Sequence, residues 1–230
     1  MIRWSLLRCA TASGVLAIFL LNAACLRLDA PHPEKAAYLL SAQRDAETTA
    51  TLSKRVLQVD PFESAPCCLG RSFVYRSGDH IWMQDYYHEF FTAPPAMLTE
   101  ISRQWLQQSG LFDQVVGTGY PPPSHLLRGR IVNLHGDYRS GRTPEAVLEL
   151  EFSLWNLRGG APVEPLQQSY HRRLALTDRR PESLVQAWSE ALAEILAELE
   201  TTLRQRFAAD AGAVFPTPPP PASRSDQSAF

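Results

Sequence analysis

The most regular pattern of hydrophobic and polar residues lies between residues 146 and 157. Here leucine and phenylalanine alternate with glutamate and serine. A period of two is typical of a β-strand that has one face in the core and the other in water. The apolar positions of this strand are Leu148, Leu150, Phe152 and Leu154.

Shorter patterns predict further strands, several of them separated by turns rich in glycine, proline and polar residues. The segment 80–91 follows a hairpin turn at residues 77–79 and is partly apolar on both faces. Two apolar faces predict a strand inside the sheet rather than at its edge. The further strands cover residues 37–41, 52–59, 72–76, 80–91, 112–116, 125–134 and 167–177.

Two segments have the helical period instead. One helix is expected to begin at Pro94-Pro95 and to end before Gly110, since proline suits a first turn and glycine a C-terminal cap. A longer helix is expected to begin at Pro181, with several glutamates on its polar side. The apolar stripes are Leu98, Ile101, Trp105 and Leu106, and Leu184, Trp188, Leu192, Ile195, Leu199 and Leu203.

These elements predict an α/β fold, with a mixed, largely antiparallel sheet flanked by two amphipathic helices. Residues 37–208 are expected to form one domain, because their number is typical of a single hydrophobic core. Residues 209–230 include four consecutive prolines, Pro218 to Pro221. Such a composition favours extended polyproline II and cannot bury a core, so a disordered tail is predicted.

The N-terminus differs in composition from the rest of the chain. Residues 1–24 contain Arg3 and Arg8 but no acidic residue, and an apolar run follows from residue 13 to 21. These are the parts of a secretory signal peptide, and the run is too short to span a membrane. Cys25 after two alanines resembles the lipobox of bacterial lipoproteins, although Asn22 occupies a position where leucine is commonest. Lipidation of Cys25 is therefore expected, with plain secretion as the alternative and residues 25–36 as a tether.

Net charge excludes one class of function. The chain has 22 basic and 24 acidic side chains, a formal net charge of −2 at pH 7. Binding driven by nucleic-acid phosphates needs a concentrated basic face, so no nucleic-acid partner is expected. A weakly acidic protein is not attracted to anionic headgroups, so membrane attachment would depend on the acyl chains. Leu26 after the cysteine favours sorting to the outer membrane.

No known catalytic motif is present: the nucleophile elbow, the Walker loop and the dinucleotide-binding glycine pattern are all absent. Glu149 and Glu151 could form a carboxylate pair, but a solvated sheet face is the favoured interpretation. The stretch from Arg172 to Arg180 could meet phosphates, but is interpreted as solvated surface. Asp137-Tyr138 is interpreted as part of a turn, and His88-Glu89 lacks the second histidine of a zinc motif. We expect no enzymatic activity, no metal and no cofactor.

The cysteine positions do not favour a redox function. Of the four, Cys9 lies in the signal segment and Cys25 is the lipidation site, which leaves the adjacent pair Cys67-Cys68. Neighbouring cysteines can close a strained vicinal disulfide. The favoured interpretation is two small residues in a loop without redox function.

The domain resembles the ABC-type transport auxiliary lipoproteins, the PqiC-like family, over roughly residues 36–207. The order and spacing of short motifs carry the resemblance. The matching segments are Phe73-Val74-Tyr75-Arg76, Tyr86-Tyr87-His88, Ala93-Pro94-Pro95, Trp105-Leu106, Ser109-Gly110-Leu111-Phe112 and Gly136-Asp137-Tyr138.

This resemblance implies a fold similar to the anticodon-binding or TolB N-terminal arrangement. It also implies a non-enzymatic accessory subunit of a lipid transport system, with an MCE-domain protein and ABC transporter subunits as partners. An envelope-assembly or peptidoglycan-associated lipoprotein is the alternative, and a secreted hydrolase is a third. An adjacent ATPase, permease and MCE gene would favour the first.

With no catalytic constellation, function is expected to reside in surfaces. Five aromatic residues fall within ten positions from residue 82 to 91. If some of them face outward, they would serve self-assembly into a homo-oligomer or docking onto the MCE subunit; if all are buried, they form core. The candidate docking residues are Trp82, Tyr86, Tyr87, Phe90 and Phe91.

Overall fold

The computed structural model describes residues 34–44, 54–158 and 165–212, and the compact unit begins at Ala36. The predicted signal peptide, Cys25 and most of the tether lie outside the described residues, as does the tail from residue 213. Helix α3 continues to Gly212. The predicted start of the tail, residue 209, is therefore four residues too early, since residues 209–212 still belong to the helix.

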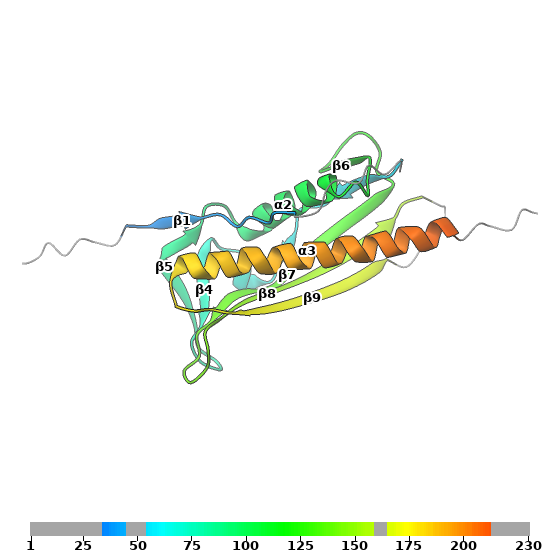
Figure 1. Ribbon diagram of the computed structural model, residues 1–230. Coiled ribbons are helices and arrows are strands. Elements are labelled where there is room, and N and C mark those ends of the chain that lie inside the picture. The colour runs from blue at the N-terminus through cyan, green and yellow to red at the C-terminus, as the bar shows by residue number, and fades with distance from the viewer. Residues whose placement is uncertain (1–33, 45–53, 159–164, 213–230) are drawn as a thin grey trace, which may run out of the picture. The chain divides into compact units, whose positions relative to one another are not determined.

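The predicted class is confirmed: within the described residues, a nine-stranded mixed sheet, not closed into a barrel, packs with two α-helices (Figure 1). The helices are α2 (Pro94–Gln108) and α3 (Pro181–Gly212). The strands are β1 (Ala36–Tyr38), β2 (Val56–Val59), β3 (Glu63–Ser64), β4 (Ser72–Arg76), β5 (Trp82–Phe90), β6 (Gln114–Val116), β7 (His125–Asp137), β8 (Glu145–Asn156) and β9 (Leu166–Ala175), and a 3-10 turn, η1 (Pro66–Cys68), follows β3.

Strand β7 organises the sheet. Along one edge it pairs with β8 in antiparallel register from His125 to Asp137, and β8 pairs in turn with β9. Along its other edge β2, β3 and β4 follow one another in chain order, each parallel to β7. The three long strands carry the alternating pattern that predicted them. The sequence analysis missed β3, which has two residues and no pattern of its own.

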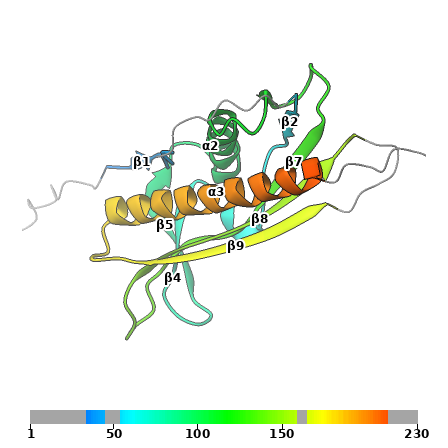
Figure 2. The ribbon, with the colours of Figure 1, turned by 45° about the vertical axis from the view of Figure 1, so that its right-hand side comes forward.

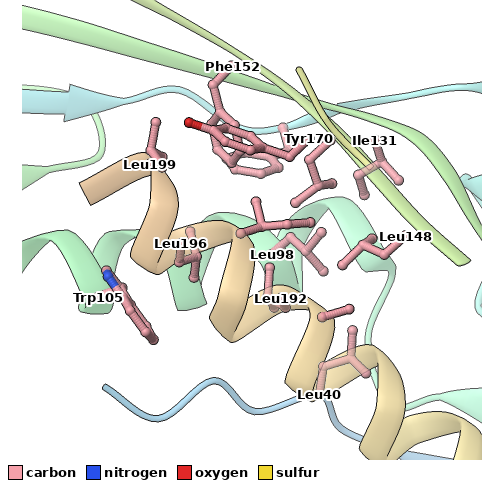
Figure 3. Packing of buried hydrophobic residues seen from close by; sticks show 14 of the residues in the cluster. Leu40, Leu98, Trp105, Ile131, Leu148, Phe152, Tyr170, Leu192, Leu196 and Leu199 are labelled. Atoms are coloured by element: carbon pink, nitrogen blue, oxygen red, sulfur yellow. The ribbon is translucent and has the colours of Figure 1, made fainter. Parts of the chain in front are cut away.

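Helices α2 and α3 pack with the apolar face of the sheet, and α3 lies across β8 and β9 (Figures 1 and 2). Figure 3 shows Leu98 of α2 and Leu192 of α3 beside Leu148 of β8. All three side chains are fully buried. Helix α2 begins at two prolines and ends before Gly110, whose φ of 69° only glycine adopts at low cost.

Trp188 lies in the middle of the α3 stripe, and its side chain is completely buried. Its ring packs edge-on against Phe73 of β4 at a centroid distance of 5.2 Å. Its indole N–H donates to the carbonyl oxygen of Val147 on β8, 3.2 Å away. The residue therefore joins the last helix to two parts of the sheet and satisfies its polar atom inside the core.

A buried ion pair fastens the first described segment to α3. Arg44 donates two hydrogen bonds of 2.8 Å to the carboxylate of Glu200. That carboxylate also accepts the indole N–H of Trp105, from α2, at 3.0 Å. Burial raises the pKa of Glu200, but the bonds from Arg44 and Arg204 outweigh it and hold that pKa below its usual value.

Candidate docking surface on strand β5

The structure divides the five predicted docking residues. Phe90 is buried, with 2% of its surface exposed, and packs on Phe73 and Trp188. Its assignment as a docking residue is wrong, because its position on β5 points it into the core. The other four, Trp82, Tyr86, Tyr87 and Phe91, are 46%, 70%, 37% and 64% exposed.

Two apolar neighbours that the sequence analysis did not single out enlarge this group. Ile81 is 60% exposed and Met83 is 55% exposed. We call these exposed residues, which lie on both faces of β5 and at its two ends, the β5 aromatic surface: Ile81, Trp82, Met83, Tyr86, Tyr87 and Phe91. Groups of large exposed apolar side chains are typical of interaction sites, so this group is the candidate docking surface.

A bulge in β5 explains why both tyrosines face outward. Strand β4 pairs with β5 at Val74↔Gln84 and again at Ser72↔Glu89, so the residues between Gln84 and Glu89 outnumber those opposite them. A bulge of this kind interrupts alternation and re-aims side chains. The rings of Tyr86 and Tyr87 then pack edge to face, with centroids 5.1 Å apart.

Asp85 holds this bulge in place. Its Oδ1 accepts the backbone N–H groups of Tyr87 and His88, at 2.8 and 3.0 Å. Its Oδ2 accepts the hydroxyl of Tyr75 on β4 at 2.9 Å and lies 2.8 Å from Nδ1 of His88. Burial raises the pKa of Asp85, but these bonds, with that to the His88 side chain the strongest, hold that pKa below its usual value.

The position of β5 in the sheet differs in part from prediction. Strand β1 covers only its last residues, through the parallel pairs Ala36↔His88, Ala37↔Glu89 and Tyr38↔Phe90. Along residues 82–87, within the part of the chain that the structure describes, β4 is the single pairing strand. The prediction of an interior strand is therefore correct for the end of β5 and wrong for its beginning. There the apolar residues on both faces are exposed.

Ion pairs hold the hairpin that carries the aromatic surface. Arg139, after β7, contacts Asp79 of the β4–β5 turn at 3.0 Å and Asp137 at 2.7 Å. Asp137 is 2% exposed and also contacts Arg173 of β9 at 2.7 Å. Hydrogen bonds from Arg139 hold the pKa of Asp137 well below its usual range, despite burial. The residue expected to belong to a turn is thus the centre of a network that joins two hairpins.

Trp82 rests on this end of the sheet rather than standing free. Its ring lies edge-on to His135 of β7 at 4.8 Å, and the Arg76 guanidinium lies 5.7 Å from its centroid. Burial lowers the pKa of His135 to about 4, so the imidazole beneath Trp82 is neutral at neutral pH. One part of the indole therefore packs against the sheet, and the rest is exposed to solvent.

The other candidate residues are paired with their neighbours. Glu149 accepts a hydrogen bond from Asn133, and Glu151 accepts one from Arg130, so the two carboxylates bind different partners. A hollow of about 620 Å³ lies over this polar face of β7, β8 and β9. Cross-strand pairs of this kind match the predicted solvated face.

The arginine stretch is also paired. Arg172 contacts Glu194 and Glu198 of α3, and Arg180 contacts Asp178. These contacts match the prediction of a surface stretch. Among the described residues, no group of three or more metal-ligating side chains comes together, and no helix is long and apolar enough to cross a membrane.

Comparison with known proteins supports the fold. No family model matches the sequence, and no curated protein matches it. Protein XCC0632 from Xanthomonas campestris, of the family DUF330, is similar to this chain with a TM-score of 0.65 at 15% identity, over 76% of this chain and 99% of that one. An uncharacterized protein of known structure gives a TM-score of 0.58 at 17% identity, over 74% and 99%. These two similarities show the fold.

A weaker similarity is to the rare lipoprotein B from Shewanella oneidensis. Its TM-score is 0.32 at 12% identity, over 68% of this chain and 96% of that one.

Proposed function

We propose that the protein is a non-enzymatic lipoprotein of the bacterial envelope that serves as an auxiliary subunit of an MCE/ABC-type lipid transport system. The signal sequence with Cys25 supports a lipid anchor, and the sequence resemblance to the auxiliary lipoproteins supports the assignment to this transport system. The observation that carries the proposal is the β5 aromatic surface, in which Asp85 holds the backbone of the strand at Tyr87 and His88.

In this proposal the β5 aromatic surface binds the MCE-domain subunit. Aromatic side chains supply large contact area at low cost in conformational entropy, and binding energy concentrates on them. The open edge of residues 82–87 adds backbone groups that an extended segment of the partner could pair with. The acyl chains would hold this surface at the outer membrane, facing the periplasm.

The anchor is tested by one substitution. In cells grown with labelled palmitate, Cys25→Ser should abolish labelling of the protein and release it from membranes into the periplasm. Unchanged labelling in this variant would end the lipoprotein assignment. Density-gradient fractionation of the unmodified chain should place it with the outer membrane.

The partner is tested by site-specific crosslinking. A photo-reactive amino acid replaces Tyr86 in one variant and Tyr120 in a matched control, because Tyr120 is 91% exposed but lies outside the β5 aromatic surface. The proposal predicts a crosslink to the MCE-domain protein at position 86 and none at position 120. Crosslinks at position 86 to a second copy of the chain alone would contradict docking and indicate self-assembly.

A further inference from the structure

Two thiols lie side by side in the turn between β3 and β4. Cys67 and Cys68 occupy the 3-10 turn η1, and their Sγ atoms are 3.0 Å apart. Cys67 is exposed and its Sγ lies 4.0 Å from the carbonyl oxygen of Val132 on β7, whereas Cys68 is 4% exposed. At this distance the two sulfurs are in contact and are not bonded to each other.

In the mature chain that the proposed function implies, neither cysteine has a third cysteine available for a disulfide. The sequence contains four cysteines, of which Cys9 would leave with the signal peptide and Cys25 would carry acyl chains. The envelope is an oxidising compartment, in which exposed thiols do not persist unless they are protected. Cys67 can therefore be oxidised with its neighbour or with another molecule, and the neighbour is already in contact.

We propose that Cys67 and Cys68 form a vicinal disulfide in the envelope. This inference rests on the proposed location of the protein, but not on its transport partners. An envelope thiol–disulfide oxidoreductase in its disulfide form is the oxidant. Two S–H bonds of the pair are lost and one S–S bond forms, while the disulfide of the oxidant takes up two electrons and two protons and becomes a dithiol.

The different exposure of the two sulfurs sets the order of the steps. Cys67 is the accessible sulfur, so its thiolate attacks the oxidant and forms a mixed disulfide. Burial and the contact with Cys67 raise the pKa of Cys68 to about 12, which protects that thiol from external reagents. Cys68 then loses its proton and its Sγ attacks the Sγ of Cys67, the sulfur beside it. The S–S bond between Cys67 and the oxidant breaks, and the leaving sulfur of the oxidant takes up a proton.

Such a bond is readily reversed. Consecutive Cα atoms are only ~3.8 Å apart, below the ~4.4 Å at which ordinary disulfides begin, so a bridge between neighbours is strained. Strained, exposed disulfides are the labile ones. The pair would thus respond to redox conditions at the connection between β3 and β4, where Ala65 donates a hydrogen bond to the carbonyl oxygen of Ile131 on β7.

Oxidation of the purified protein tests the geometry. Trypsin releases the two cysteines together in one peptide, residues 56–71, which contains no other cysteine. The mature chain with Cys25→Ser is reduced, exposed to oxidised glutathione, denatured and alkylated. The peptide should carry no label and be lighter by two hydrogens, and it should take up two labels after reduction. A lasting glutathione adduct on Cys67, or a disulfide-linked dimer, would overturn the proposal.

Two variants show which sulfur reacts first. Cys68→Ser should retain a stable glutathione adduct on the exposed Cys67, because the resolving thiol is missing. Cys67→Ser should remain unmodified while folded, because Cys68 is buried. Modification of Cys68 in the folded Cys67→Ser variant would contradict the order of steps.

The state in cells is measured on the acid-quenched, unmodified chain with the same peptide. Membrane-bound protein with a bridged pair supports the proposal, and membrane-bound protein with two free thiols overturns it. Protein absent from the membrane fraction would instead contradict the proposed function, and the oxidation of the purified protein would then decide the inference alone.

Discussion

The hydroxyl of Tyr75 on β4 donates a hydrogen bond of 2.9 Å to Asp85 on β5, across the bulge. The same carboxylate binds the backbone of Tyr87 and His88. One partly buried contact between strands therefore helps to set the backbone from which the two exposed tyrosines project. The fold and the proposed binding surface are coupled through this pair.

Asp85→Ala should disturb the β5 aromatic surface while leaving the fold intact. It removes the acceptor of Tyr75 and of two backbone N–H groups, so we expect a loss of ~1–3 kcal/mol in the free energy of unfolding. The orientation of Tyr86 and Tyr87 should be lost, and partner binding should weaken. Asp85→Asn keeps one acceptor oxygen and should lie between the two in both urea unfolding and binding. Full binding by a folded Asp85→Ala variant would show that the bulge is not required.

Trp188→Ala tests the core that supports β4 and β5. The side chain is completely buried between α3 and the sheet, so its removal leaves a large cavity. We expect a loss of ~3–5 kcal/mol in urea unfolding. Glu190→Ala on the exposed side of the same helix should change stability by less than ~0.5 kcal/mol. Similar values for both variants would mean that α3 packs weakly.

Removing one partner of the Arg44–Glu200 pair should cost more stability than replacing both partners by apolar residues. Glu200→Ala removes the buried carboxylate that accepts hydrogen bonds from Arg44, Trp105 and Arg204. Breaking a buried pair in this way costs ~3–5 kcal/mol, whereas apolar replacement of both partners is often neutral. The double variant Arg44→Leu, Glu200→Leu should therefore be more stable than Glu200→Ala. The opposite order in thermal unfolding would contradict this account.

Acid should destabilise the fold through two buried histidines. Burial lowers the pKa of His125 and of His135 from 6.5 to about 4. The unfolded chain therefore binds protons first, so their contribution is complete above about pH 6.5 and is lost as the pH falls towards about 4. Unfolding in urea at about pH 7 and about pH 5 should show a larger decrease for the unmodified chain than for a His125→Asn, His135→Asn variant. Equal decreases would assign the acid sensitivity to other groups.

Periodicity predicted the long strands and helices because the side chains within each of them carry the pattern of buried and exposed positions. The alternation around Leu150 and the stripe around Trp188 each arise from burial of one face, and the structure places both as expected. The chain around Asp85 could not be predicted in this way. Its bulge depends on Tyr75, ten residues away and on another strand, and a bulge erases the alternation from which faces are inferred.

The candidate surface was predicted in outline only. The density of aromatic residues identified the segment. Alternation puts Phe90 and Phe91 on opposite faces but does not show which face is covered, nor that Ile81 and Met83 join the surface. Those assignments depend on which strand covers which part of β5. Asp137 was underestimated for the same reason, since its partner Arg173 lies on β9, 36 residues away.

Co-purification of the MCE-domain subunit tests the central claim most directly. Tyr86→Ser and Tyr87→Ser are compared with Tyr120→Ser, and each variant is also melted, because all three tyrosines are exposed and the fold should survive. We predict unchanged melting temperatures in all three, at least a ~10-fold loss of retained partner for the two β5 variants, and no loss for the control. Full retention of the partner by folded Tyr86→Ser and Tyr87→Ser would contradict the proposed docking surface.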